Sequence, residues 1–393
     1  MHTLELILFL VALAWCGVGL FLLWGINGIT ILRPVPRSEA LPQLPRVSVI
    51  LAARNEQETL PTTLESLLNL DYPDYEVILV DDDSDDRTGA IADEWMERPA
   101  SRGKLRVIHN HELPTGWRGK VHAMSLAEQA ATGEWVLATD ADVVCEPSLL
   151  RQAMILALQK DARLLSLTPE LDMQSLAEKV VMPAFGFFLF MLFPPRLVNH
   201  PNSGRALAAG AFLLMRRKDL ASLGGYPRLR NTLVEDLRMS EMFKHNGHRI
   251  YLAVTRGLFR TRMYKNWREV FEGLTRSAWE GADRSIWKVL GALIVGNALA
   301  VLPWVSLATL LLVHAFAGTL PVGDPTLLAG AATALSVIIY CPIILFAGLS
   351  PLYALTLPFA SLFYSAVAVT SALFSLTGPG VRWKGRWYQS PSS

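Results

Sequence analysis

Two carboxylates separated by one residue, Asp140 and Asp142, follow an apolar run at residues 135–138. On an extended segment, side chains at i and i+2 point to the same side, so both could reach one hard divalent cation. A cation held in this way could bind a diphosphate. A second acidic pair, Glu235 and Asp236, follows about 95 residues later and is expected to open a helix. These residue types and their spacing indicate chemistry on a diphosphate-linked substrate.

Three polar clusters fall where predicted strands end. Short apolar strands are predicted at residues 47–53, 76–80, 105–108 and 135–138, and helical patterns lie between them. This alternation predicts an α/β fold with a mostly parallel sheet covered by helices. Ligands bind at the carboxyl ends of the strands in such sheets. We therefore expect residues 52–56, 81–83 and 140–142 to converge on one crevice.

Composition excludes some classes of protein. The chain has 393 residues, of which 51% are hydrophobic, and its 36 basic side chains nearly balance its 35 acidic ones. No charge excess would recruit nucleic acid, so we expect no nucleic-acid partner. The sequence has no GxGxxG after the first strand and no GxxxxGK[ST], which argues against a dinucleotide-binding fold and a P-loop NTPase.

The distribution of charge predicts a membrane protein. Residues 4–23 form an apolar run of 20 residues, long enough to cross a hydrocarbon layer of roughly 30 Å. The run lacks a basic start and a cleavage pattern, so we expect an uncleaved anchor. Arg33, Arg37 and Arg46 follow it, which places the next domain in the cytoplasm by the positive-inside rule. Between residues 289 and 380 the only formally charged residue is Asp324, and this block predicts about three further spans.

The predicted division of the chain follows from these patterns: an N-terminal transmembrane anchor at 1–32, a linker at 33–45, a cytoplasmic catalytic domain at 46–263, an amphipathic interfacial helix at 264–288, a C-terminal transmembrane region at 289–378 and a basic tail at 379–393. Three C-terminal spans would put the basic tail outside, against the positive-inside rule. A re-entrant, interfacial or split segment would remove the conflict, so the topology at this end stays open. The Phe-rich stretch at 180–195 is either a buried core helix or an interfacial helix beside a lipid acceptor.

The ordered motifs resemble those of the family-two glycosyltransferases of GT-A fold. The resemblance covers residues 46–281, and it rests on residues 47–56, 80–84, 139–142 and 235–236. The apolar segments also fit the membrane-bound branch of that family. Within the branch, residues 114–120, the Phe-rich stretch and residues 383–386 look like the bacterial hopene-associated glycosyltransferases, with ceramide and carotenoid glycosyltransferases more distant.

The resemblance implies a role for each matching position. Ala52, Arg54 and Glu56 would line the nucleotide site, and Asp82 would contact the uracil and ribose. Asp140 and Asp142 would hold Mg²⁺ or Mn²⁺ on the diphosphate, with Lys120 near its charge. Asp236, in its pair with Glu235, would be the catalytic base, and a single displacement with one base inverts the anomeric centre.

One departure from the family pattern bears on the product. The membrane-bound branch often carries QxxRW after the base, and the corresponding stretch here, residues 273–277, keeps only Arg276. Processive polysaccharide synthases use the full motif, so its loss favours a single transfer. Arg276 remains a candidate diphosphate contact.

We therefore predict a multi-pass enzyme of the bacterial inner membrane that moves a sugar from a UDP-sugar to a membrane lipid, hopanoid-like or sphingolipid-like. A processive or polyprenyl-phosphate-directed transferase is one alternative. A catalytically silent membrane scaffold that retains only the fold is another. Glu235 and Asp236 could also be acidic residues that merely stabilise a helix N-terminus through its dipole.

Overall fold

The computed structural model describes residues 3–36, 43–318, 324–377, 381–383 and 386–388. These residues group into two compact units, each described here by itself. The sheet unit comprises Gly28–Asp172 and Pro195–Met263. The apolar-helix unit comprises the first 27 residues, Met173–Pro194 and the chain from Tyr264 on.

The sheet unit is built on an eight-stranded sheet in the order β1-β10-β7-β9-β5-β2-β3-β4. Every neighbouring pair is parallel except that β9 runs antiparallel to both β5 and β7. The strands are β1 (Ile31–Leu32), β2 (Val47–Ala53), β3 (Tyr75–Asp82), β4 (Leu105–Asn110), β5 (Trp135–Thr139), β7 (Leu164–Thr168), β9 (Leu213–Arg216) and β10 (Ile250–Thr255). The predicted α/β fold with a mostly parallel sheet is confirmed.

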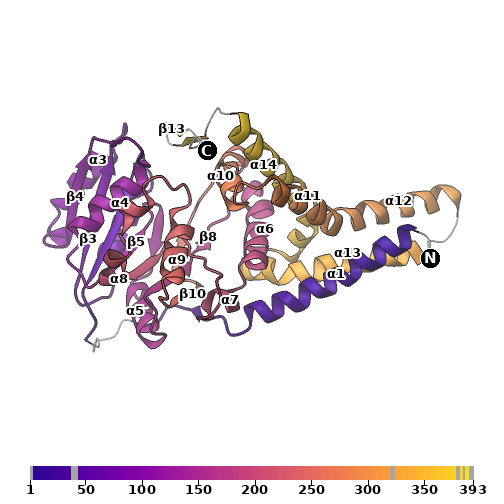
Figure 1. Cartoon of the computed structure of the whole chain (residues 1–393), viewed down its shortest axis with the longest axis horizontal. Coiled ribbons are helices and arrows are strands. Elements are labelled where there is room, and N and C mark those ends of the chain that lie inside the picture. The colour runs from indigo at the N-terminus through magenta and orange to yellow at the C-terminus, as the bar shows by residue number, and fades with distance from the viewer. Residues whose placement is uncertain (1–2, 37–42, 319–323, 378–380, 384–385, 389–393) are drawn as a thin grey trace. The chain divides into compact units, whose positions relative to one another are not determined.

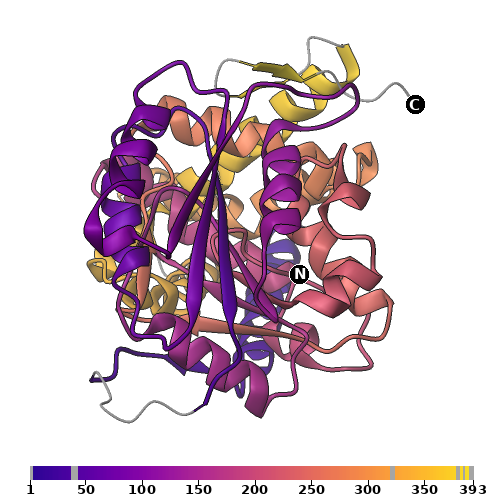
Figure 2. The same cartoon turned by 90° about the vertical axis from the view of Figure 1, so that its left-hand side faces the viewer.

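The central strands are buried because helices cover both faces of the sheet, as Figure 2 shows. Strands β2 and β5 are buried along almost their whole length, which explains why they read as continuous apolar runs rather than alternating ones. Helix α4 (Gly119–Ala130) packs against β2 and β3, and α3 (Thr88–Met96) packs against β3 and β4 (Figure 1). In α2 (Leu60–Leu68), the predicted apolar face of Leu60, Leu64, Leu67 and Leu68 is buried.

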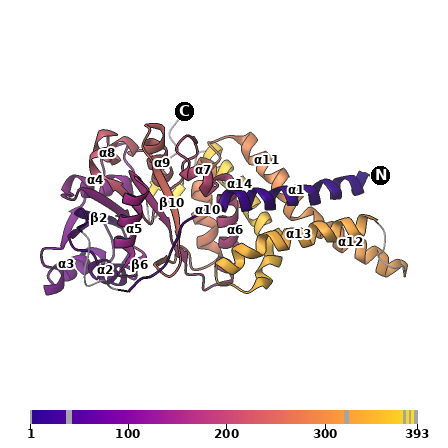
Figure 3. The ribbon, with the colours of Figure 1, turned by 90° about the horizontal axis from the view of Figure 1, so that it is seen from below.

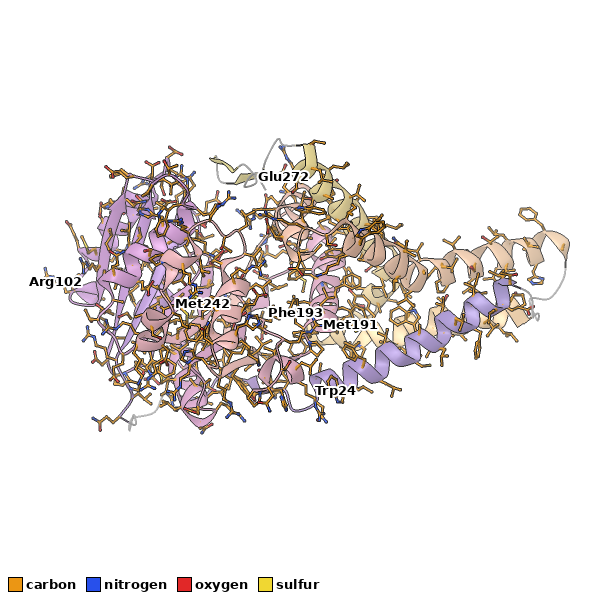
Figure 4. The ribbon with its side chains drawn as sticks, viewed as in Figure 1. Trp24, Arg102, Met191, Phe193, Met242 and Glu272 are labelled. Atoms are coloured by element: carbon orange, nitrogen blue, oxygen red, sulfur yellow. The ribbon has the colours of Figure 1, made fainter. Side chains whose placement is uncertain are left out.

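Further helices complete the sheet unit. Helix α9 (Glu235–His245) has two acidic residues in its first turn and two basic residues in its last, an arrangement that the helix dipole favours. Its Met242, labelled in Figure 4, is buried. The remaining helices are α5 (Leu149–Gln159), α7 (Pro195–Asn199), α8 (Arg217–Ser222) and the 3-10 helices η1 (Pro99–Ser101) and η2 (Tyr226–Leu229).

A small second sheet lies directly after the Asp140–Asp142 segment in sequence. Strand β11 (Phe259–Thr261) pairs antiparallel with β6 (Val143–Cys145) and parallel with β8 (Glu170–Leu171). Because β6 begins at Val143, this sheet fixes the chain directly after Asp142.

The apolar-helix unit consists mainly of helices with few charges. They are α1 (Thr3–Ile26), α6 (Leu176–Leu192), α10 (Trp267–Gly281), α11 (Ile286–Ala300), α12 (Leu302–Ala317), α13 (Asp324–Phe346) and α14 (Leu357–Thr377), with the 3-10 helix η3 (Pro351–Thr356). Strands β12 (Val381–Trp383) and β13 (Arg386–Tyr388) form a hairpin within the predicted basic tail. The rest of that tail (378–380, 384–385 and 389–393) and residues 37–42 of the predicted linker lie outside the described residues.

Three helical segments of this unit are long and apolar enough to cross a membrane: Thr3–Ile26, Pro325–Phe346 and Pro351–Thr377. Helices α11 and α12 are bent by 40° at Val301 and would together make a fourth span. The prediction was one N-terminal and about three C-terminal apolar segments, and the structure has one N-terminal and two to three C-terminal ones. The bend falls inside the first predicted C-terminal segment, and both a broken span and a re-entrant loop, two of the predicted alternatives, have this geometry.

The helices of this unit are apolar both where they pack against one another and on their outer surface. Helices α1 and α13 run side by side in Figures 1 and 3, and Trp15, Phe187 and Tyr340 are buried in the interior. On the outside, Leu20 of α1 is 70% exposed, and Trp24, labelled in Figure 4, is also exposed. Apolar side chains exposed in such numbers are typical of a surface that contacts lipid or another protein.

The compact units divide the chain differently from the predicted segments. Residues 173–194, which the sequence places inside the catalytic segment 46–263, group with the apolar helices because α6 buries its Ala184 and Phe187 among them. Helix α6 is capped at Ser175, whose hydroxyl accepts a hydrogen bond from the Glu178 N–H. Conversely, Ile31 and Leu32 of the predicted anchor segment pair with β10 as an edge strand of the sheet.

Candidate active site

The carboxyl ends of three parallel strands lie side by side in the sheet unit. Strand β2 pairs with β3 on one side, where Ala53 is opposite Asp81, and with β5 on the other, where Leu51 is opposite Thr139. The polar segments that follow β2, β3 and β5 therefore leave the same edge of the sheet, which is where α/β sheets bind ligands.

The segment that carries Asp140 and Asp142 is a turn anchored on both sides. The Thr139 hydroxyl donates to the Ala211 carbonyl at 2.8 Å, and the Ala141 carbonyl accepts from the Thr63 hydroxyl at 2.9 Å. Both carboxylates are half-buried. Strand β5 ends at Thr139 and the chain turns at Ala141 and Asp142, so the extended geometry expected for the pair is not present. The turn, rather than strand periodicity, sets the directions of the two side chains.

Lys120 joins the first of these carboxylates to the acidic pair of α9. Its Nζ lies 2.8 Å from Asp140 Oδ1 and 2.6 Å from Glu235 Oε1. Burial opposes the charged form of this lysine, but the two carboxylates outweigh burial and raise its pKa well above the ordinary value. Segments separated by more than a hundred residues are thus held together by one ammonium group.

Asp236 lies beside this ion pair and is held by two backbone N–H groups. Its Oδ2 accepts from Gly210 at 2.8 Å, and its Oδ1 accepts from Leu237 at 2.8 Å. A Cβ at position 210 would lie 3.2 Å from Asp236 Oδ2, so glycine permits this close approach of the backbone. Burial and the neighbouring charge of Glu235 raise the pKa of Asp236 to about 6, although Lys120 acts in the opposite direction.

A small cavity connects these groups. It is lined by Lys120, Met124, Ala138, Thr139, Gly210, Leu213, Tyr226, Glu235, Asp236 and Met239. All of these residues belong to the sheet unit, so the cavity is formed within one compact unit. Of the predicted site residues, Lys120, Asp140, Glu235 and Asp236 therefore come together.

The predicted nucleotide-site residues lie at the ends of β2 and β3. Arg54 is buried, and its guanidinium donates to the carbonyls of Asp82 and Asp83 at 2.5 Å each. Asp82 is also buried and accepts from Asn110 at 3.0 Å. Arg54 thus fixes the backbone after β3, a role that the sequence did not indicate.

The other two predicted residues of this region are more open. Ala52 is partly exposed near the end of β2, opposite Val80. Glu56 is half-buried, and its N–H donates to the Thr88 hydroxyl at 2.8 Å while its carboxylate accepts from Thr59 at 2.9 Å. The contact with Thr88 ties the chain after β2 to the start of α3.

Arg276 belongs to the apolar-helix unit, where it lies on α10. Near it, the Ser371 hydroxyl of α14 donates to the Thr275 carbonyl at 2.6 Å and accepts from the Trp279 N–H at 3.0 Å. Helix α10 is amphipathic as predicted, with Val270 and Leu274 buried and Arg268 exposed. The predicted contact of Arg276 with a diphosphate stays a prediction.

The carboxylate oxygens of Asp140 and Asp142 are suitable ligands for a divalent cation that a substrate also coordinates. Carboxylate oxygens are the ligands that Mg²⁺ and Mn²⁺ favour. Among the described residues, no group of three or more His, Cys, Asp or Glu side chains could enclose a metal ion. Substrate phosphates and water would have to complete the coordination, as is common for Mg²⁺ bound through one or two carboxylates.

The order and direction of the strands define an α/β fold of GT-A type, with polar groups gathered at one edge of the sheet. Residues 48–224 match the family model "Glycosyl transferase family 2". This part of the chain is therefore similar to glycosyltransferase family 2 domains, the nucleotide-sugar-dependent enzyme class that its motifs predict. The match ends before Glu235 and Asp236.

Curated relatives share part of the chain. It is 32% identical over 138 residues, 34% of this chain and 28% of the relative, to beta-monoglucosyldiacylglycerol synthase of Trichormus variabilis. It is 29% identical over 252 residues, 60% of this chain and 62% of the relative, to 4,4'-diaponeurosporenoate glycosyltransferase of Staphylococcus haemolyticus. The chain thus spans less than two thirds of the length of these relatives.

A solved structure shares the fold. The mannosyltransferase PcManGT from Pyrobaculum calidifontis, determined in complex with GDP-Man and Mn²⁺, superposes with a TM-score of 0.56 at 23% identity. The superposition covers 95% of this chain and 99% of that one. The likeness confirms the GT-A fold.

Sequence reasoning missed two residues of the cavity region. Tyr226 lines the cavity, and Glu128 on α4 accepts a hydrogen bond from the Tyr226 N–H at 2.9 Å. The consecutive glycines at 224 and 225 were the available signal, because both have positive φ angles and mark a tight turn before Tyr226.

Proposed function

We propose that the protein is an inverting glycosyltransferase that moves a sugar from a UDP-sugar to a membrane lipid. One observation carries the proposal: Lys120 bridges Asp140, at the end of a central strand, and Glu235, at the start of α9, beside Asp236. A group suited to the donor diphosphate and a group suited to the acceptor proton thus share one cavity.

Asp236 is the proposed general base. As the acceptor hydroxyl oxygen attacks C1 of the sugar, the carboxylate takes the hydroxyl proton and the bond from C1 to the diphosphate oxygen breaks. The N–H groups of Gly210 and Leu237 orient the carboxylate for this transfer. General base catalysis contributes about 10²- to 10⁴-fold to such a step. With one base and one displacement, the configuration at C1 inverts.

Asp140 and Asp142 are the proposed ligands of Mg²⁺ or Mn²⁺. When bound, the cation would neutralise charge that develops on the diphosphate leaving group. The surrounding charges support a cation here, because the carboxylates of Asp140, Glu235 and Asp236 lie around the ammonium group of Lys120. A diphosphate would meet net repulsion in this cavity without an added positive charge.

The remaining predicted residues act on the donor nucleotide. Asp82 is the proposed contact of the uracil and ribose, and Ala52 and Glu56 the proposed wall beside it. Arg54 acts indirectly, because its contacts with the Asp82 and Asp83 carbonyls hold the loop in place. Arg276 is the proposed further diphosphate contact.

The acceptor is proposed to be a lipid, hopanoid-like or sphingolipid-like, in the bacterial inner membrane. Helices long and apolar enough to span a membrane support this proposal. The names of two relatives also support it, since one is a glucosyldiacylglycerol synthase and the other acts on diaponeurosporenoate. The sheet unit would then face the cytoplasm, in line with the arginines that follow α1.

Thin-layer chromatography of membrane lipids after incubation with labelled nucleotide sugars tests this proposal. We expect a labelled lipid with wild type and about a hundredfold less or lower still with Asp236→Asn, while the exposed control Asp161→Asn behaves like wild type. Equal product from wild type and Asp236→Asn would refute the role of the base. A long labelled polymer in place of a lipid would favour a processive transferase.

Metal binding is tested separately from turnover. Calorimetric titration of Mn²⁺ in the presence of UDP should show binding to wild type that Asp140→Asn and Asp142→Asn weaken. Unchanged Mn²⁺ affinity in both variants would refute the proposed ligands.

A further inference from the structure

Tyr226 is a buried tyrosine that lines the candidate active site. Its side chain is only 3% exposed. Within the part of the chain that the structure describes, its hydroxyl forms no hydrogen bond, while its backbone N–H donates to the Glu128 carboxylate. Two other buried tyrosines of the sheet unit have bonded hydroxyls: Tyr75 donates to the Leu68 carbonyl at 2.8 Å, and Tyr251 pairs with the Thr30 hydroxyl at 2.8 Å. The Tyr226 hydroxyl is not among the fully enclosed unpaired polar atoms of the described residues, so a ligand in the cavity that Tyr226 lines can reach it.

The backbone around Tyr226 is held firmly in this position. The Glu128 carboxylate on α4 accepts from the Tyr226 N–H at 2.9 Å. Gly225 has φ of +59°, and a Cβ there would collide with the Glu128 carboxylate. At the other end of η2, the Arg118 N–H donates to the Arg230 carbonyl at 2.7 Å. Both ends of η2 are thus fixed to the helix that carries Lys120, so the ring cannot easily turn away to find a partner elsewhere.

The position of η2 places the phenol between two functional sides of the cavity. Helix η2 contacts α4, which supplies Lys120, and α9, which supplies Glu235 and Asp236. Burial, and then the charge of Glu235, raise the pKa of Tyr226 well above its ordinary value, with Lys120 acting in the opposite direction. The hydroxyl therefore keeps its proton at neutral pH and can donate a hydrogen bond.

We propose that the Tyr226 hydroxyl binds a hydroxyl group of the sugar on the nucleotide donor. This inference rests on the proposed function and deepens it, because it assigns a specificity residue for the transferred sugar. The sugar must lie between the diphosphate, beside Asp140 and Lys120, and the base, Asp236. Tyr226 lines the cavity between these groups, whereas the nucleoside would lie at the ends of β2 and β3.

The proposal predicts different effects on binding of the transferred sugar and on binding of the rest of the donor. Free UDP carries the uracil, ribose and diphosphate but no transferred sugar. Removing the Tyr226 hydroxyl should therefore weaken binding of a nucleotide sugar and leave binding of the free nucleotide unchanged. A neutral hydrogen bond of ordinary strength corresponds to a loss of about three- to tenfold in affinity.

The experiment is calorimetric titration of the full-length protein in detergent, with Mn²⁺ present. UDP-glucose, UDP-N-acetylglucosamine and GDP-mannose are each compared with UDP or GDP for wild type, Tyr226→Phe and the control Tyr251→Phe. We expect Tyr226→Phe to raise Kd about three- to tenfold for the nucleotide sugar that wild type binds most tightly, with no change for the free nucleotide. Tyr251→Phe, which loses a hydroxyl bonded to Thr30, should change neither.

Two results with Tyr226→Phe would overturn the inference. Equal affinities of wild type and variant for the nucleotide sugar would show that the hydroxyl makes no contact with it. An equal loss of affinity for nucleotide sugar and free nucleotide would show that Tyr226 only supports the cavity. If wild type binds free nucleotides but none of the nucleotide sugars, the proposed function fails, and the inference fails with it.

Discussion

The raised pKa of Asp236 predicts how the rate should depend on pH. A carboxyl group with a pKa of about 6 is mostly ionised at pH 7 and mostly protonated at pH 5. Only the ionised form can take a proton from the acceptor. We therefore expect kcat/KM to rise with pH through about 6 and to level off above 7, because this parameter reports groups of the free enzyme.

The size of the effect follows from the titration curve. With a pKa of about 6, the ionised fraction falls from about nine tenths at pH 7 to about one tenth at pH 5, a loss of about tenfold in kcat/KM. An aspartate with an ordinary pKa near 3.9 would stay more than about nine tenths ionised at pH 5, and the rate would hardly change. The two cases differ clearly in a standard assay.

The assay measures transfer of labelled sugar to extracted lipid between pH 5 and 8, at donor concentrations below KM. Asp236→Asn should lower kcat/KM by about 10²-fold or more, and its residual rate should lack the rise near pH 6. A wild-type profile that is flat between pH 5 and 7, or one whose rise persists in Asp236→Asn, would refute the assignment of Asp236 as the base.

Three further substitutions test other parts of the structure. Lys120→Met removes the positive charge that lowers the pKa of Asp236, so the rise in kcat/KM should move to higher pH and donor affinity should fall; an unchanged midpoint would contradict this. Gly210→Ala places a Cβ 3.2 Å from Asp236 Oδ2 and should lower kcat by about tenfold or more, whereas Gly204→Ala, with open space around its Cβ, should not. Ser371→Ala removes the link between α10 and α14 and should lower the free energy of unfolding by about 0.5 to 2 kcal/mol, which thermal unfolding in detergent would detect as a lower Tm.

Much of the fold could be predicted from the sequence because local patterns determine it. The buried runs of β2, β3 and β5 are continuous apolar stretches, and the four leucines of α2 lie at helical spacing. The polar segments that follow these strands then had to meet at one edge, since parallel strands share a direction. The long apolar helices were predicted for the same reason: their length and composition are local properties.

The parts that were not predicted depend on contacts between distant segments. Lys120 links Asp140 to Glu235, which lies more than a hundred residues further along the chain than Lys120. No rule of sequence spacing predicts such a contact. The sequence indicated a ligand contact for Arg54, which stays a prediction, but not its hydrogen bonds to the carbonyls of Asp82 and Asp83, because backbone partners leave no trace in a sequence. The apolar composition of α6 fitted either alternative, and only its packing against Trp15 and Tyr340 distinguishes an interior helix.

The burial that raises the pKa of Asp236 and suits it to base catalysis should also make its ionised form unfavourable for the stability of the folded protein. Because its pKa in the folded protein, about 6, is higher than the ordinary value of 3.8, the folded state binds its proton more tightly than the unfolded state does. The stability that this residue contributes is therefore fully present below pH 3.8 and is lost as pH rises through about 6, by up to about 2 to 3 kcal/mol. The loss is complete at the pH where the carboxylate is active, so the hydrogen bonds from Gly210 and Leu237 hold an ionised group in a position that burial disfavours. Such a cost is expected of a residue retained for catalysis and is unexpected of a carboxylate that merely stabilises the start of a helix.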